Sequence, residues 1–104
     1  MQGTSDVIQK VLLAAACDIV GATGVASTSR NCAVARTGAG VYTVTLPSGY
    51  GLDVDETIIN VTVEGVGIPA AIVTSDTVVT VSTFDAAGVA ADVNIQSIEI
   101  SRLL

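Results

Sequence analysis

The densest group of carboxylates in this chain of 104 residues is the run Asp53-Val54-Asp55-Glu56, directly before an apolar stretch. Alternating carboxylate oxygens in a loop can bind Ca²⁺, but such a site takes about six to eight oxygen ligands and a glycine-bearing turn between them. The other ligands are missing from the sequence around this run. We therefore interpret it as a solvated loop at the start of a strand, and we expect no metal and no cofactor.

Groups that perform acid–base or nucleophilic chemistry near neutral pH are scarce. Histidine and tryptophan are absent, so proton transfer would fall to carboxylates, tyrosines or Lys10. Neither Ser48 nor Ser75 lies in a nucleophile elbow with a base. Gly38 and Gly40 lie between strands without a lysine or a following helix, so they form no phosphate-binding loop. We therefore expect that the protein is not an enzyme and has no catalytic residues.

The two cysteines, Cys17 and Cys32, are separated by a predicted turn. As cross-strand neighbours they could form a disulfide if their Cα atoms lie within about 7 Å. The interpretation that we favour is a pair of small buried apolar side chains in a protein made in a reducing compartment. Without histidine, these thiols have no partner for a nucleophilic dyad or a mixed metal site.

Two other side chains are candidates for contact rather than catalysis. Tyr50, between Gly49 and Gly51, is the one plausible aromatic face for a sugar, although a lone loop tyrosine is more often a packing anchor. Arg36 stands at a strand end, immediately before a turn. Its planar guanidinium suits a bridge to an acidic residue of a neighbouring subunit. The alternative is an exposed arginine that has no partner.

These residues are carried by an unusually apolar chain. Hydrophobic residues make up 50% and charged residues 13%, against about a quarter charged in ordinary soluble domains. Because monomers rarely expose large apolar patches, the surplus predicts a surface that faces another subunit or another protein. The alternative is an unusually dry sandwich rich in valine, alanine and threonine.

The charge balance argues against two classes of partner. The net charge is −6, and the four basic residues are spread along the chain as Lys10, Arg30, Arg36 and Arg102. Nucleic-acid binding requires clustered cations, and anionic membranes disfavour an acidic surface for the same reason. No apolar run approaches the eighteen or so residues of a transmembrane helix. We expect neither nucleic acid nor membrane as a partner.

Valine, isoleucine and threonine suit a pleated, half-buried surface, so the fold class is expected to be all-β. Residues 14–104 are predicted to form one antiparallel β-sandwich or jelly roll of about seven to eight short strands. Residues 1–13 are expected to form a short helix or an irregular arm, because the apolar positions fit a spacing of three to four better than alternation. The alternative for the same residues is an edge strand. The expected strands cover 14–20, 25–29, 31–36, 41–46, 55–63, 70–74, 78–84 and 93–100.

Two of these strands carry detailed expectations. Tyr42, Val44 and Leu46 should point into the core, after a turn in which Gly38 and Gly40 supply positive φ angles. In the last strand, the pairs Val93/Ile95 and Ile98/Ile100 have opposite parity. A β-bulge near Gln96-Ser97 would bring both pairs to one side. The alternative is a strand buried on both faces by a neighbouring subunit.

Three segments together resemble small β domains of tailed-bacteriophage surface proteins: the run from Arg36 to Leu46, the strand Val61-Thr62-Val63, and the run from Val81 to Asp92 before the final strand. These families comprise capsid decoration (cement) proteins, head fibres and tail-fibre tips, which are commonly trimeric. The resemblance covers roughly residues 14–102. No heptads precede the domain, and this departure favours a compact capsid cap over a tail fibre.

The resemblance implies a virion structural protein on the capsid surface, a homotrimer that stabilises the shell through contacts with the major capsid protein. Its apolar N-terminal segment, with Val7, Val11 and Leu12, and the strand-end Arg36 are the expected interface residues. The alternative is the receptor-binding domain of a phage head or tail fibre, with Tyr50 as the ligand contact.

Overall fold

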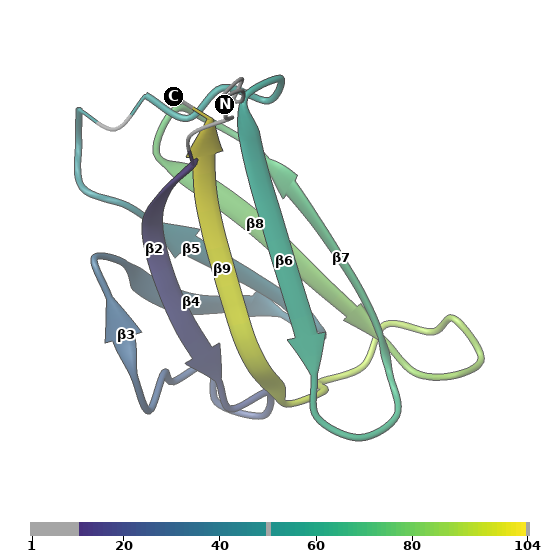
Figure 1. Cartoon of the computed structure of the whole chain (residues 1–104). Helices are drawn as coiled ribbons and strands as arrows, with labels where there is room; N and C mark the ends of the chain where they lie inside the picture. Colours follow the sequence, from purple (N-terminus) through teal and green to yellow (C-terminus); the bar gives the residue numbers. More distant parts are fainter. Residues whose placement is uncertain (1–10, 50, 104) are drawn as a thin grey trace, which may run out of the picture.

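Eight strands and no helix form in residues 11–49 and 51–103, the part of the chain that the computed structural model describes (Figure 1). Two antiparallel four-stranded sheets pack together, which confirms the predicted all-β sandwich. The first sheet has the order β3 (Ser29–Arg30), β2 (Val11–Ile19), β9 (Ile95–Leu103), β6 (Thr57–Val63). The second has the order β4 (Ala33–Gly38), β5 (Val41–Thr45), β8 (Val78–Phe84), β7 (Ile68–Val73).

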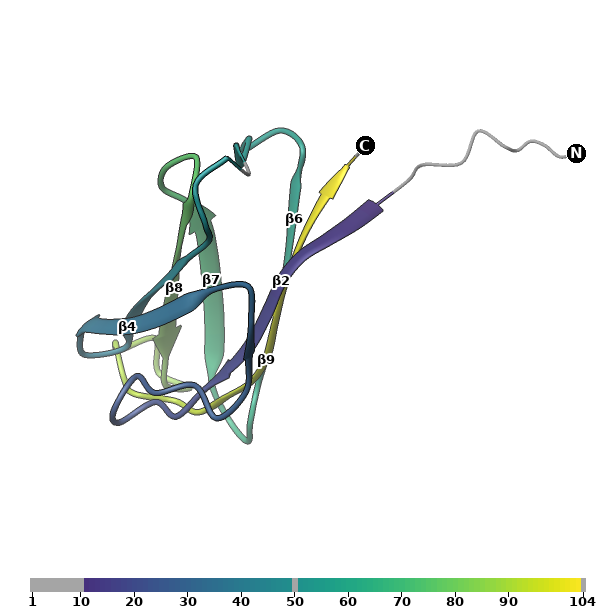
Figure 2. The same cartoon turned by 90° about the vertical axis from the view of Figure 1, so that its left-hand side faces the viewer.

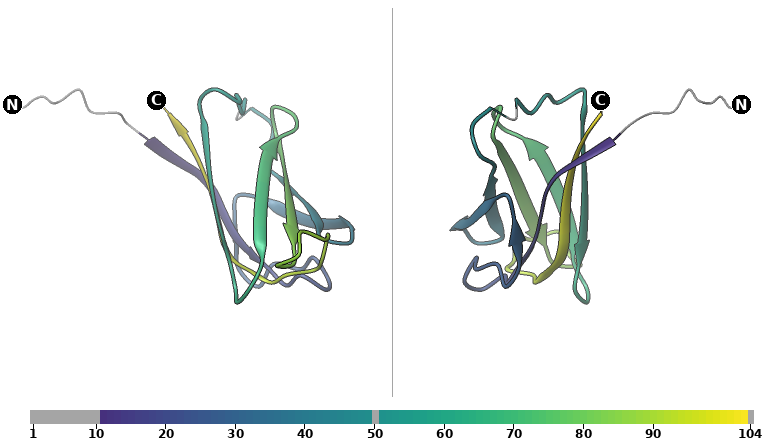
Figure 3. Two further views of the ribbon diagram at one scale, coloured as in Figure 1. Left: turned by 90° about the vertical axis from the view of Figure 1, so that its right-hand side faces the viewer. Right: turned by 60° about the vertical axis from the view of Figure 1, so that its left-hand side comes forward.

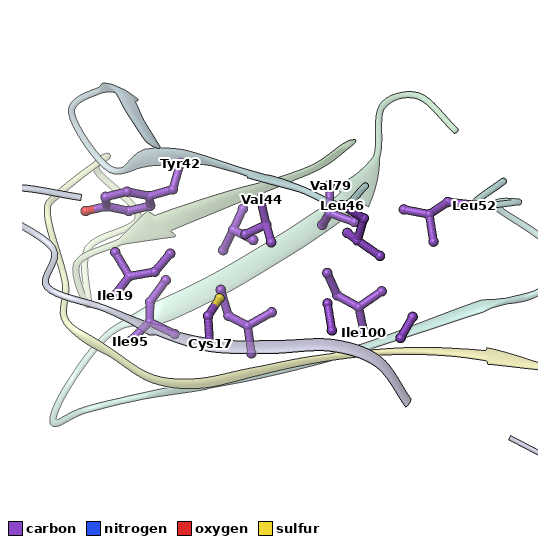
Figure 4. Packing of buried hydrophobic residues seen from close by; sticks show 13 residues of the cluster. Cys17, Ile19, Tyr42, Val44, Leu46, Leu52, Val79, Ile95 and Ile100 are labelled. Carbon is purple, nitrogen blue, oxygen red and sulfur yellow. The ribbon is translucent and has the colours of Figure 1, made fainter. Parts of the chain in front are cut away.

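The core fills the space between the two sheets, as Figure 4 shows from close by. As predicted, Tyr42, Val44 and Leu46 point into it and are 0–3% exposed. Their alternation with threonine gives β5 one apolar face, because successive side chains in a strand point to opposite sides. The other core residues come mainly from the central strands of both sheets: Ala14, Ala15, Cys17, Ile19, Leu52, Val79, Val81, Ile95, Ile98 and Ile100.

The predicted bulge in the last strand is present in β9. The ladder with β6 shifts register between Thr62/Ser97 and Val63/Ile95, so one residue of β9 is extra. Ile95, Ile98 and Ile100 consequently all face the core, at 0–2% exposure. Val93, expected on the same side, precedes β9, is half-buried and is not part of the core cluster. One inserted residue reverses the alternation that follows it, and burial by a second subunit is not needed to explain the sequence.

The turn between β4 and β5 differs from expectation at one glycine. Gly40 has a φ of 67°, whereas Gly38 is not in the left-handed region. A Cβ atom on Gly40 would also lie 2.5 Å from the carbonyl oxygen of Thr83. Glycine is therefore required at position 40 for two reasons: the positive φ angle, and the nearby Thr83 carbonyl, which leaves no room for a side chain. The expected positive φ angle at Gly38 was wrong.

The N-terminal boundary also needs correction. Residues 11–13 are not part of a helix or arm but the beginning of β2, where Val11 pairs with Leu103 and Leu12 with Arg102. The run Val11-Leu12-Leu13-Ala14-Ala15-Ala16 favours helix by composition, and the ladder with β9 overrides that weak preference. Residues 1–10 lie outside the described residues. The expected strand over 25–29 is reduced to a bridge between Val20 and Val25 and the short β3.

The two sheets meet at both lateral sides of the sandwich. On one side the chain passes directly from β6 to β7, so the outermost strands of the two sheets lie beside each other (Figure 3). On the opposite side it passes from β3 to β4. The part of the chain that is described contains no helix able to cross a membrane.

Candidate interaction surfaces

The carboxylate run before β6 forms a hydrogen-bonded turn. Asp53 Oδ1 accepts a hydrogen bond from the Asp55 N–H at 2.9 Å, and the Asp53 carbonyl accepts one from the Glu56 N–H at 3.0 Å. All three side chains are exposed. Within residues 11–49 and 51–103, no three metal-ligating side chains of the His, Cys, Asp or Glu type gather into a group that could hold an ion. The run thus acts locally, by fixing the start of the strand.

A polar cluster at one end of the sandwich joins four segments of the chain. Arg36 makes a bidentate ion pair with Asp92, with Nε to Oδ1 at 3.1 Å and Nη2 to Oδ2 at 2.9 Å. Asp92 Oδ1 also accepts the Gly40 N–H at 2.7 Å. The Tyr42 hydroxyl lies 3.2 Å from the same oxygen and donates to the Gly21 carbonyl at 2.7 Å. The cluster fastens the loop before β9 onto the β4–β5 hairpin.

This environment shifts the pKa values of the groups involved. The hydrogen bonds from Arg36 and from the Gly40 N–H lower the pKa of Asp92 to about 2. The pKa of Tyr42 is raised, first by burial and then by the negative charge of Asp92. Asp92 is therefore a carboxylate and Tyr42 a neutral phenol across the ordinary pH range, so neither is poised to exchange a proton.

Arg36 thus has a partner in its own chain, which is neither of the arrangements that the sequence suggested. The Nε and Nη2 groups of its guanidinium both bind the carboxylate of Asp92, 56 positions further along the chain. The alternative of an arginine without a partner was wrong, and the expected bridge to a neighbouring subunit would have to compete with Asp92. Asp92 escaped the sequence analysis because nothing in a loop of small residues marks it as the partner of a strand end.

The two cysteines are free thiols in this structure. Cys17 is 6% exposed in the core, and the Cys32 thiol lies 3.7 Å from the Ala16 carbonyl oxygen. Burial, and after it the neighbouring Cys32, raises the pKa of Cys17 to about 12. Because the thiolate is the reactive form, Cys17 is not a nucleophile near neutral pH. Its packing matches the favoured interpretation of a small apolar side chain.

The outer face of the second sheet carries no charged side chain. The cross-strand pairing fixes which residues point away from the core, because Ala35, Thr43, Thr80 and Ile72 form one row across the sheet. We call the whole set the neutral face: Ala33, Ala35, Val41, Thr43, Thr45, Ile68, Ala70, Ile72, Val78, Thr80, Ser82 and Phe84. Apart from Phe84, it consists of small and β-branched residues on four strands, the composition of a surface that packs against another flat surface.

The outer face of the first sheet differs in character. Arg30, Asp18 and Glu99 line a shallow hollow of about 270 Å³ there. Asn60 and Glu99 face each other across the ladder between β6 and β9. The two sheets form opposite sides of the molecule (Figure 2). The charged residues Asp18, Arg30 and Glu99 therefore lie on the side opposite the neutral face.

The other expected interface residues lie at the end where β2 begins. Leu12 is 45% exposed, and the neighbouring Leu13 is 55% exposed. Both precede the region where β3 pairs with β2. The main chain of Val11 pairs with Leu103, while Val7 and Tyr50 lie outside the described residues. Leu12 lies at the start of β2, whereas Arg36 lies in the separate polar cluster with Asp92.

Comparisons with protein-family models, with curated proteins and with solved structures found no match. The candidate surfaces therefore rest on the geometry and charge of this chain.

Proposed function

We propose that the protein is a structural protein of a virion surface, a capsid decoration or cement protein that binds the major capsid protein through the neutral face. The observation that carries the proposal is that face, which is four strands wide, uncharged and turned away from the core of an otherwise acidic molecule. Half of its residues are exposed and half are half-buried. Interface cores are depleted of charged residues. The assignment to a capsid rests in addition on the resemblance of the sequence to phage surface proteins.

The size of the neutral face indicates how such a protein would attach. Four strands about 4.8 Å apart, with about six residues each at about 3.4 Å, cover roughly 400 Å² of plane. Contact with a flat partner would bury on the order of 800 Å² in total, below the roughly 1,200–2,000 Å² of a stable interface. One face alone would bind weakly. Attachment therefore requires several copies held together, whose linked contacts raise the overall affinity.

The first test places a charge at the centre of this face. Thr43 lies in the row between Ala35 and Thr80. The substitution Thr43→Glu should reduce attachment to particles at least tenfold, because its carboxylate would lose its water in the contact. The measurement is the amount of chain on gradient-purified particles from a culture that carries the gene. Gln96→Glu, exposed on the outer face of the first sheet, is the matched control and should attach normally.

Wild-type chain that remains in the soluble fraction would overturn the proposal. Equal attachment of Thr43→Glu and the wild type would show that the neutral face is not the contact.

A further inference from the structure

The two cysteine thiols lie next to each other at the point where the chain crosses between the sheets. Cys17 lies on β2 of the first sheet with its side chain in the core (Figure 4), and Cys32 directly precedes β4 of the second sheet. Cys32 packs against the core cluster, with its thiol 3.7 Å from the carbonyl oxygen of Ala16, the residue before Cys17. It is also a hydrogen-bonding neighbour of the Cys17 thiol. A bond between the two sulfur atoms would therefore join the two sheets.

The backbone at Asn31 brings Cys32 to this position. Asn31 has a φ of 62°, the one positive φ angle of a non-glycine residue in the described ranges 11–49 and 51–103. Asparagine tolerates this left-handed conformation better than most residues. Its side-chain amide donates a hydrogen bond to the Ala14 carbonyl at 2.9 Å. The residue before Cys32 is thus held against the strand that carries Cys17.

The two thiols differ in how easily a molecule in solution can reach them. Cys17 is 6% exposed, whereas Cys32 is half-buried and lines a shallow surface hollow of about 500 Å³. The other residues that line this hollow are uncharged: Asn31, Ala33, Thr45, Leu46 and Pro47. A small neutral reagent would therefore meet Cys32 first.

We propose that Cys17 and Cys32 are a dithiol site that a small neutral disulfide oxidises to an intramolecular disulfide, which fastens the two sheets together. Cys32 gives up its proton and attacks one sulfur of the reagent, whose S–S bond breaks and releases one small thiol. Cys17 then gives up its proton and attacks the Cys32 sulfur, and the second small thiol leaves. Two protein thiols are oxidised, the reagent is reduced to two thiols, and both protons end on those thiols. The inference goes beyond the proposed function, because it does not depend on what the neutral face binds.

The environment of Cys17 determines the order of these two steps. Burial, and after it the neighbouring Cys32 and Asp18, raises the pKa of the Cys17 thiol to about 12, so very little thiolate is present at neutral pH. Cys17 is therefore inert toward reagents in solution and attacks only a sulfur that is held beside it. We expect a mixed disulfide on Cys32 to appear first and the internal bond to form more slowly.

The internal bond would close the segment 18–31, which contains little regular pairing of its own. Its strand β3 has two residues, and the only other ladder contact within it is the bridge between Val20 and Val25. A disulfide that closes a loop stabilises a fold mainly by restricting the unfolded chain. The oxidised protein should therefore resist urea better than the reduced protein.

The test is treatment of the reduced full chain with hydroxyethyl disulfide in a mildly alkaline buffer, followed by mass spectrometry. The final product should weigh two hydrogen atoms less than the reduced chain. Trypsin cleaves after Lys10, Arg30 and Arg36, so the disulfide should link peptide 11–30 to peptide 31–36. The midpoint of urea unfolding should be at least about 0.5 M higher for the oxidised chain.

Two variants are the controls. Cys17→Ala should stop at the mixed disulfide on Cys32, and Cys32→Ala should leave Cys17 reduced. A wild type that stops at the mixed disulfide, that links two chains instead, or whose oxidised form unfolds at no higher urea concentration would overturn the inference. If either variant fails to fold, iodoacetamide treatment of the native wild type supplies the same information: it should alkylate Cys32 and spare Cys17, and equal alkylation of both thiols would contradict the proposed order of steps.

Discussion

At the scale of single residues, the Arg36–Asp92 ion pair is the most specific interaction of the described chain. Its side chains are 34% and 27% exposed, so the pair holds a surface loop rather than filling the core. The sequence showed that Arg36 ends a strand, but a partner 56 positions away is set by how the loop before β9 returns across the sandwich. Long-range pairing of this kind has no local signal.

The substitution Asp92→Asn should change how the free energy of unfolding depends on pH. The folded-state pKa of Asp92, about 2, lies below its ordinary value of 3.8. Its stabilising contribution is therefore present above about pH 4 and is lost as the pH falls through 2. Urea unfolding at steps from pH 5 to pH 2 should show a shallower loss of unfolding free energy in the variant than in the wild type.

Asp76→Asn, an exposed residue in the turn between β7 and β8, is the control for this loss of charge. It should keep the acid dependence of the wild type. Identical slopes for the Asp92→Asn variant and the wild type would contradict the assignment of this pair as a brace for the loop.

At the scale of elements, alternation in the sequence predicted the interior strands well and their ends poorly. The inward residues of β5, and Ile95, Ile98 and Ile100 of β9, were predicted correctly, because each strand has a core face that only one register can bury. Val93 was wrongly expected among them, since it lies before β9 and outside the core. Over residues 11–13, the sequence favoured a helix or an arm over a strand, and only the pairing of β2 with Leu103 and Arg102 decides for the strand. The neutral face required the pairing of all four strands of its sheet, which no single segment reveals.

The bulge in β9 makes a quantitative prediction about Ile98. Ile98→Ala should destabilise the fold by about 2–5 kcal/mol, the usual loss when an aliphatic core side chain is truncated. Ile72→Ala, which removes the same atoms from a side chain that is 59% exposed, should cost less than about 1 kcal/mol. Denaturant unfolding of both variants at a concentration of a few micromolar tests the difference. Similar losses would mean that Ile98 does not face the core.

At the scale of the whole molecule, the distribution of charge decides which parts of the surface can bind another copy or another acidic protein. The net charge of −6 makes copies of the chain repel one another, and the neutral face is the part of the surface where that repulsion should be weakest. The sequence indicated a surplus of apolar surface through its 50% hydrophobic composition. Where that surplus lies depends on which strands become edges, and this follows from the topology of the two sheets.

Acid should therefore allow copies of the chain to associate through any part of their surface. The chain has a pI of about 4.1, so its mutual repulsion vanishes near that pH. Turbidity of a dilute solution should be greatest near pH 4 and absent at pH 7. A clear solution of the wild type through pH 4 would show that repulsion is not what limits association.

The pairing of Val11 with Leu103 has a mechanical consequence. Both ends of the described chain lie at one end of the sandwich, on adjacent antiparallel strands (Figure 1). A force that pulls these ends apart breaks the hydrogen bonds between β2 and β9 one pair after another, beginning at Val11 and Leu103. A tether through both ends would therefore yield at low force. Tension would be better resisted if it acted along the strands from opposite ends of a pair, because the inter-strand hydrogen bonds run perpendicular to the strands and would then all be loaded at once.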